Sequence, residues 1–396
     1  MRTVKWNAFL SCLCGFAVVL GGVAISARAD VTTEKGASIL IFPKVRADGT
    51  FDTVIQIANL SNNMVHARCF YVNATLQDTS CQCPCTVPSA TCVPLCQETD
   101  FEIWLTKQQP THWNVSTGRN FTPYPTFGED DSGFAPGHVP PMINFVGELK
   151  CIEVSDSGEP ITRNDLKGEV TLVALADTGS NSNQTVTGDI AKYNAIGIRG
   201  NPNVAPSSPL LLDGYNGDPA DLTTSYGACP AKLILNHVAS GAPDLVEDEL
   251  TDLGVLPAGT TSAAFTDLTL VPCTEDFEDQ IVKSVTIQFL IYNEFEEVFS
   301  TSTTVSCFLE TELATIGSGQ IFGYGVLGTD VAQAIITPVV QADNSSGGLV
   351  GIAEKIVTAT MGTAPTTAGR AAYNLHSEGS YIPPNGPDSI TLSAQP

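Results

Sequence analysis

Five of the chain's twelve cysteines fall within sixteen residues, in the segment CQCPCTVPSATCVPLC at positions 81–96. Cysteines this dense usually form disulfides or a metal site, and either one restricts how the surrounding chain can fold. The segment contributes Cys81, Cys83, Cys85, Cys92 and Cys96, and the chain after residue 29 adds Cys69, Cys151, Cys229, Cys273 and Cys307. If all ten pair within one chain, an odd number of bridges must leave the segment, and Cys69 is the nearest partner in sequence.

The first 29 residues have the three parts of a secretory signal peptide. Arg2 and Lys5 give a positive start, residues 9–25 carry no charge, and Ala27-Arg28-Ala29 fits a cleavage site before Asp30. A membrane anchor is the alternative, but this glycine-interrupted stretch is shorter than the roughly 20 residues that a spanning helix needs. We therefore expect an exported protein, secreted or located at the cell surface or in the periplasm, with oxidised cysteines.

A metal or redox site is the alternative to disulfides for the segment. Closely spaced thiolates suit zinc, copper(I) or an iron–sulfur centre. However, no C-x-x-C pair occurs in it, and no histidine lies between residues 67 and 111. Zinc sites and thioredoxin-like redox sites both use such pairs. We therefore predict that all ten cysteines form disulfides and that residues 78–99 are a loop inserted between two strands.

Short β-rich runs separated by turn sequences dominate the remaining chain. In residues 52–59, Val54 and Gln56 alternate with Ile55 and Ile57, which is the period of a half-buried strand. Runs of similar composition predict strands at 38–45, 52–59, 64–73, 101–107, 145–154, 169–176, 191–199, 232–237, 264–271, 282–292 and 298–309. Helices of one to three turns are expected at 162–167 and 244–253, and residues 348–360 are expected to add a strand or a short helix. The predicted fold class is mainly β, with antiparallel β-sandwich domains, immunoglobulin-like or jelly-roll-like, and a cysteine-rich loop insertion.

Two stretches of the chain repeat the same order of features. Residues 52–72 and 283–310 each contain an apolar strand, a polar turn around an asparagine and a returning strand. Cys-Phe lies near the end of both, at Cys69-Phe70 and Cys307-Phe308. Chance similarity between two hairpins is the alternative to a true repeat, which would mean two sandwich domains of similar build.

Composition along the chain predicts its domain organisation. Residues 201–221 are rich in proline, glycine and asparagine, as expected of a linker. The expected order is a signal peptide (1–29), an N-terminal sandwich (30–200), this linker and a C-terminal sandwich (222–340). A segment rich in glycine, threonine, alanine and proline (341–396) ends the chain.

The chain is strongly acidic, with 42 Asp and Glu against 18 Lys and Arg and a net charge of −24. Nucleic acids and anionic membrane surfaces are bound through basic residues, so neither is an expected partner. Charged residues are nevertheless only 15% of the chain and hydrophobic ones 43%, which is enough apolar content for a large core.

Residues 101–127 contain the candidates for contact with a ligand. Trp104, Trp113 and Tyr124 lie among Pro, Asn and Gly, where aromatic rings can stack on sugars or anchor a partner protein. The alternative is that they cover the end of a sandwich.

One acidic loop is a candidate cation site. Calcium takes six to eight oxygen ligands, and the residues that offer them are Asp213, Asn216, Asp218 and Asp221. A solvated surface loop is the alternative, and calcium is the only cofactor considered.

The most consistent function is a structural or binding role at the cell surface or outside the cell. Adhesion, surface assembly and contact with carbohydrate or protein all fit, with self-assembly into a polymeric fibre as one alternative. No nucleophile elbow, phosphate-binding loop or H-E-x-x-H sequence occurs in the chain. An enzyme is therefore not expected. A secreted hydrolase remains the other alternative, with a site assembled from dispersed residues such as His112, His138 or His237.

Overall fold

The computed structural model describes most of the chain after residue 30. The residues described are 31–78, 80–85, 91–119, 137–176, 185–204, 210–214, 224–242, 261–278, 284–317, 320–340, 347–361, 364–383 and 386–393. The expected signal peptide and the expected helix at 244–253 therefore lie outside the described residues.

The N-terminal half forms two facing sheets. The six-stranded sheet has the spatial order β1 (Val31–Thr32), β13 (Ile196–Ile198), β2 (Ile39–Ala47), β10 (Phe145–Val154), β4 (Val65–Asn73) and β8 (Gln97–Leu105). The four-stranded sheet has the order β12 (Thr185–Asn194), β11 (Leu166–Ala176), β3 (Phe51–Asn59) and β9 (Pro110–Asn114).

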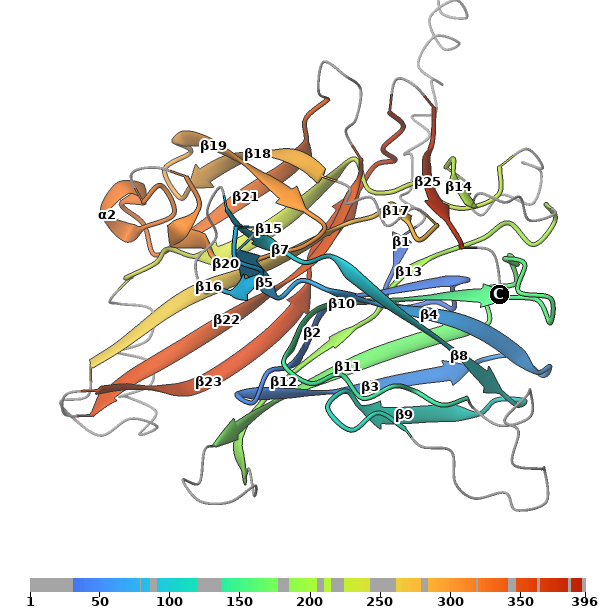
Figure 1. Cartoon of the computed structure of the whole chain (residues 1–396). Helices are drawn as coiled ribbons and strands as arrows, with labels where there is room; N and C mark the ends of the chain where they lie inside the picture. The colour runs from blue at the N-terminus through green and yellow to red at the C-terminus, as the bar shows by residue number, and fades with distance from the viewer. Residues whose placement is uncertain are drawn as a thin grey trace, which may run out of the picture.

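The C-terminal half repeats this two-sheet arrangement with different strand order (Figure 1). Its five-stranded sheet runs β19 (Val298–Ser306), β18 (Ser284–Asn293), β21 (Val331–Pro338), β15 (Lys232–Val238) and β24 (His376–Glu378). Its four-stranded sheet runs β20 (Leu309–Glu312), β16 (Thr261–Pro272), β22 (Leu349–Met361) and β23 (Ala364–Asn374).

Two small sheets and two short helical turns complete the described structure. One small sheet contains β14 (Leu210–Leu212), β25 (Asp388–Thr391) and β17 (Glu275–Asp276). The other contains β6 (Cys83–Pro84), β5 (Leu76–Asp78) and β7 (Cys92–Pro94). The helical turns are η1 (Leu313–Thr315) and α2 (Tyr324–Leu327). No helix in the described ranges is long and apolar enough to cross a membrane.

Alternation along the strands builds the core of each half. In β3, Thr53, Ile55 and Ile57 are buried between half-exposed neighbours, as the period-2 pattern predicts. The inward side chains of the six-stranded sheet meet those of β3, β9, β11 and β12 in one apolar cluster. A second cluster fills the space between the five-stranded and four-stranded sheets of the C-terminal half.

A third apolar cluster joins the two halves. In β4 and β10 both faces are buried, because the C-terminal half and the β14–β25–β17 sheet cover the outer face. Phe70 of β4 stacks on Phe277, with ring centroids 4.0 Å apart. Val72 and Ile152 of the first half lie in the same cluster as Val271 and Val350 of the second. The halves therefore share a core.

The predicted fold class is confirmed, because sandwich-like antiparallel sheets make up nearly all of the structure. The expected helix at 162–167 is wrong, because Leu166 begins β11 and the residues before it are irregular. Residues 349–361 and 364–374, within the expected C-terminal segment, form β22 and β23 of the second sandwich. The domain boundaries themselves stay predictions.

Candidate functional site

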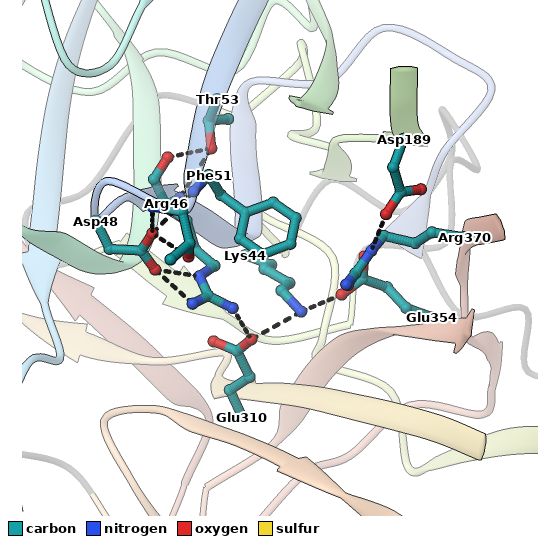
Figure 2. Close-up of polar contacts among 10 residues, drawn as sticks. Lys44, Arg46, Asp48, Phe51, Thr53, Asp189, Glu310, Glu354 and Arg370 are labelled. Carbon is teal, nitrogen blue, oxygen red and sulfur yellow. Dashed lines mark hydrogen bonds and ion pairs between the residues drawn. The ribbon is translucent and has the colours of Figure 1, made fainter. Parts of the chain in front are cut away.

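Charged side chains from both halves meet at their interface, in what we call the interface ion cluster (Lys44, Arg46, Asp48, Asp189, Glu310, Glu354 and Arg370; Figure 2). Lys44 is 1% exposed, and its Nζ lies 2.8 Å from Glu310 Oε1 and also contacts the Glu354 carboxylate. Arg46 contacts both Asp48 and Glu310. Strands β2 and β12 of the first half therefore exchange charge contacts with β20, β22 and β23 of the second.

Arg370, the cation that the C-terminal half contributes, extends this cluster. Arg370 donates to Glu354 at 3.1 Å and to Asp189 at 3.4 Å. The ring of Phe51 lies 4.7 Å from the guanidinium carbons of both Arg46 and Arg370, within cation–π range. Figure 2 shows this ring between the two arginines. The backbone of Lys44 is fixed as well, since its carbonyl accepts the Tyr193 hydroxyl at 2.6 Å.

Lys44 and Glu310 favour each other's ionised forms. Burial by itself lowers the pKa of Lys44, but the carboxylates of Glu310 and Glu354 outweigh it and raise that pKa above its usual value. Burial likewise opposes ionisation of Glu310, but Lys44 and Arg46 lower its pKa overall. Lys44 and Glu310 therefore each depend on a partner in the opposite half, and their ion pair joins the two halves.

A second buried ion group lies elsewhere on the same interface. Lys150 of β10 is fully buried, and its Nζ contacts Glu148 Oε1 at 2.5 Å and Glu275 Oε2 of β17 at 3.3 Å. Burial raises the pKa of Glu148 to about 7 although Lys150 opposes this. The nearby Glu98 also has its pKa raised to about 7, first by burial and then by Glu275. Lys150 thus forms ion pairs with a carboxylate of each half, Glu148 and Glu275.

All ten cysteines predicted to be oxidised form five disulfides. The pairs are Cys69–Cys151, Cys81–Cys83, Cys85–Cys92, Cys96–Cys307 and Cys229–Cys273. One bridge leaves the 81–96 segment, as parity requires, but its partner is Cys307 and not Cys69. Cys69 is directly opposite Cys151 in the β4–β10 register and pairs there. This many disulfides is typical of proteins that fold in an oxidising compartment, consistent with an extracellular or surface protein.

The cysteine-rich insertion, predicted at 78–99, occupies residues 74–96 between two adjacent strands, because residues 97–99 already belong to β8. It leaves β4 and returns as β8, and these two strands pair along their whole length. Two of its disulfides are internal, while Cys96–Cys307 attaches its end to the second half. Cys96 and Cys307 both have positive φ, 51° and 49°, which non-glycine residues seldom adopt. The bridge therefore joins two unusual backbone positions across the interface.

An aromatic pair lies at one end of the six-stranded sheet, beside its edge strand β8. Here Trp104 of the edge strand β8 stacks on His66 of β4, with centroids 3.8 Å apart and planes 8° from parallel. His66 Nδ1 lies 3.0 Å from the carbonyl oxygen of Ser155, and Nε2 lies 3.1 Å from Glu102 Oε2. The contact at Nδ1 orients the imidazole on which the indole stacks, whereas Nε2 lies near the Glu102 carboxylate without a hydrogen bond.

A hollow of about 580 Å³ lies beside this stack. His66 forms part of its wall, and Arg163, Asp156 and Asn203 supply polar groups from neighbouring loops. Arg163 is 44% exposed and contacts the buried Glu153, whose pKa burial raises to about 7. Of the stacked pair, only His66 lines the hollow, whose polar side chains are suited to contact with a sugar or a polar peptide.

The other two aromatic candidates do not join Trp104. Trp113 is 2% exposed, and its indole N–H donates to the Tyr71 hydroxyl at 2.7 Å inside the first sandwich. It packs edge-on against Phe101 as part of the core, so it offers no surface to a ligand. Tyr124 lies outside the described residues.

The predicted calcium loop is described only at its first residue. The Asp213 carboxylate accepts the backbone N–H of Ser225, at 3.0 Å and 3.2 Å from its two oxygens. Asn216, Asp218 and Asp221 lie outside the described residues, so this site stays a prediction. Across the described ranges, no group of three or more His, Cys, Asp or Glu side chains is placed to hold a metal ion.

The histidines named for a hydrolase are dispersed. His112 and His138 are exposed, whereas His237 is buried against Phe322. Burial lowers the pKa of His237 to about 4, and its Nδ1 lies 3.1 Å from its neighbour's carbonyl, that of Val238. His112 lines a separate hollow of about 490 Å³ on the outer face of the four-stranded sheet, together with Lys167 and Glu169.

Comparison with known proteins adds little to these observations. No family model matches the chain, and no curated protein matches it. Among solved structures, the crystal structure of the CupB6 tip adhesin from Pseudomonas aeruginosa aligns over 90% of this chain and 99% of that chain, at 10% identity and a TM-score of 0.12. At that TM-score the two folds differ, so the alignment carries no argument.

Proposed function

We propose that this is an exported structural or binding protein of the cell surface or extracellular space. The observation that carries the proposal is the way the two sandwiches are joined: a disulfide between Cys96 and Cys307, two buried ion groups and a shared apolar cluster. These contacts make the halves one rigid unit. Rigid β-scaffolds of this kind commonly present recognition surfaces on loops and sheet ends.

The contact surface in this proposal is the end of the six-stranded sheet around Trp104 and His66. Trp104 gives a flat, half-buried ring stacked on His66, and the hollow that His66 lines offers Asp156, Arg163 and Asn203. Sugars are bound by this combination, because a CH face packs on an aromatic ring while hydroxyls bond to polar side chains. We therefore propose a carbohydrate as the ligand.

Binding of the purified, oxidised protein to an array of defined oligosaccharides tests the contact surface. Trp104→Ala should abolish retention of the glycans that the wild type retains, and Asn203→Ala, at an exposed site in the hollow, should weaken it. Melting temperatures measured in parallel separate loss of binding from loss of folding. His112→Ala removes an exposed ring on the other sheet and should leave binding unchanged.

Two results would contradict the proposal. An array that retains no glycan on the wild type, or equal binding by the wild type, Trp104→Ala and Asn203→Ala, would remove the carbohydrate surface. Alkylation of the native protein in its producing cells tests export separately. Reactive thiols at Cys96 and Cys307 in a cytosolic fraction would remove the extracellular role.

A further inference from the structure

Strand β19 is a sheet edge without the usual protection against pairing with another chain. Among the described strands it borders only β18, and its sequence is VFSTSTTVS. Edge strands are normally blocked by charged side chains, by proline or by being very short. Of the described edge strands longer than three residues, β19 alone has neither a charged residue nor a proline. The edge strand β8, by contrast, carries Glu98, Asp100 and Glu102.

The backbone groups on this edge face outward at known positions. The N–H of Asn293 donates to the carbonyl of Glu297, which closes the β18–β19 hairpin. Hydrogen-bonded and non-bonded pairs alternate along an antiparallel ladder. Phe299, Thr301 and Thr303 therefore bond to β18, and the N–H and C=O groups of Ser300, Ser302 and Thr304 point to the free side. Among the described residues, no backbone bond from outside the hairpin reaches those three.

The sequence of β19 is close to symmetric about Ser302. If a second copy pairs antiparallel with its two-fold axis at Ser302, Thr301 lies opposite the partner's Thr303 and Phe299 opposite the partner's Val305. Ser300 then lies opposite the partner's Thr304. Hydroxyl therefore meets hydroxyl and apolar side chain meets apolar side chain on each face, which are favourable cross-strand pairs. The hydrogen-bonded positions also coincide, since Ser300, Ser302 and Thr304 present their backbone groups in both copies.

Charge favours this surface over the rest of the molecule. At a net charge of −24, two copies repel each other unless they meet through a region without acidic groups. The outward side chains of β18 and β19 are uncharged, namely Thr286, Gln288, Leu290, Tyr292, Ser300, Ser302 and Thr304. The nearest acidic residues lie at the hairpin turn, at Glu294, Glu296 and Glu297. An antiparallel pair places the two turns at opposite ends.

We propose that β19 pairs with β19 of a second copy, giving a two-fold symmetric dimer with one continuous sheet of ten strands. An isologous contact of this kind closes on itself, so it produces dimers and not fibres. The inference is independent of the carbohydrate surface at Trp104, which lies on the other half of the molecule.

Cross-linking at the axis tests the register directly. Ser302→Cys places two thiols opposite each other in a hydrogen-bonded pair, where Cα atoms about 5.5 Å apart permit a disulfide. The variant should run as a covalent dimer on non-reducing electrophoresis, and mass mapping should find a 302–302 bridge. Gln288→Cys is the matched control, because Gln288 is exposed and lies opposite Ser302 one strand inward. It should stay uncross-linked.

Light scattering during size-exclusion chromatography gives the second measurement. The wild type should dimerise with rising concentration, and Ser302→Glu should weaken dimerisation by at least about tenfold because it sets two like charges face to face. Gln288→Glu adds the same charge away from the axis and should have a small effect. A wild type that stays monomeric, a dimer unaffected by Ser302→Glu, or a ladder of higher cross-linked species would each overturn the proposal. If the wild type is monomeric, β19 does not pair with a second copy, and a strand from another protein becomes the alternative partner for this edge.

Discussion

Individual buried charges determine how the two halves fit together. Lys44 ends a run of apolar residues in β2, yet it is 1% exposed. Its partners, Glu310 and Glu354, lie far away in the sequence, in the second half of the chain. A lysine in that position stays charged only because Glu310 and Glu354 approach from the second half. Removing one partner of a buried ion pair leaves the other charges uncompensated, which costs more than the intact pair contributes.

Lys44→Met is therefore expected to lower the free energy of unfolding, but by less than the about 3–5 kcal/mol of a fully uncompensated buried charge. Glu310 and Glu354 lose their shared cation but keep Arg46 and Arg370. Chemical denaturation followed by tryptophan fluorescence measures the change. The matched control is Lys232→Met, which breaks a 2.7 Å pair with Glu378 between two side chains that are each 40% exposed. Equal effects of the two substitutions would show that Lys44 is not held by buried carboxylates.

Such residues could not be recognised from the sequence. An acidic or basic residue inside a β-rich run is normally interpreted as a solvent-exposed position. The neighbouring sequence does not indicate a partner several hundred residues away. Trp113 shows the same limit, because its aromatic neighbours in sequence indicated a surface while Tyr71, its hydrogen-bond partner, belongs to another strand. The disulfide chemistry was predictable from cysteine number and the expected export. The choice of Cys307 over Cys69 was not, because it depends on tertiary packing.

At the scale of elements, strand positions follow from local patterns more closely than strand partners do. The expected strand at 145–154 coincides with β10, and those at 52–59 and 232–237 each differ from the structure by one residue. The expected hairpin of residues 282–292 and 298–309 is present as β18–β19. Its apparent repeat at 52–72 is not a hairpin, since β3 and β4 lie in different sheets of the first sandwich. Turn sequences indicate where a strand ends, but not which sheet the next strand joins.

The disulfides of the cysteine-rich insertion should differ in their effect on stability. Cys96–Cys307 spans 211 residues and ties two halves together, so a Cys96→Ser, Cys307→Ser double variant should lose about 2–5 kcal/mol. Cys85–Cys92 closes a loop with a sequence separation of only seven residues. Neither cysteine belongs to any of the three apolar clusters, whereas Cys96 belongs to the third. The Cys85→Ser, Cys92→Ser variant should therefore leave the global transition in place. Thermal melting of both variants measures the two losses of stability. A larger loss in the Cys85→Ser, Cys92→Ser variant would contradict this prediction.

At the scale of the whole molecule, the interface between the halves contains the same kinds of buried contact as the core of each half. It contains its own apolar cluster, two buried ion groups and a covalent bridge. Sheet edges also meet there: β12 of the first half runs beside β23 of the second, where Asn194 and Asn374 exchange two hydrogen bonds of 3.2 Å and 2.7 Å. Sequence patterns predicted two sandwiches, but nothing in them indicated that the sandwiches would share buried groups.

This interface predicts that the two sandwiches unfold together. Chains of this length with two cores commonly unfold in separate steps. Here, separating the halves exposes Phe70 and Phe277 and takes both carboxylate partners away from Lys44, so neither half should persist alone. Scanning calorimetry of the oxidised protein should show one transition whose calorimetric and van't Hoff enthalpies agree. The Cys96→Ser, Cys307→Ser variant removes the covalent link and should still melt in one step at lower temperature, because the shared cluster and ion groups remain. Two resolved transitions in the wild type would mean that the buried groups do not couple the halves.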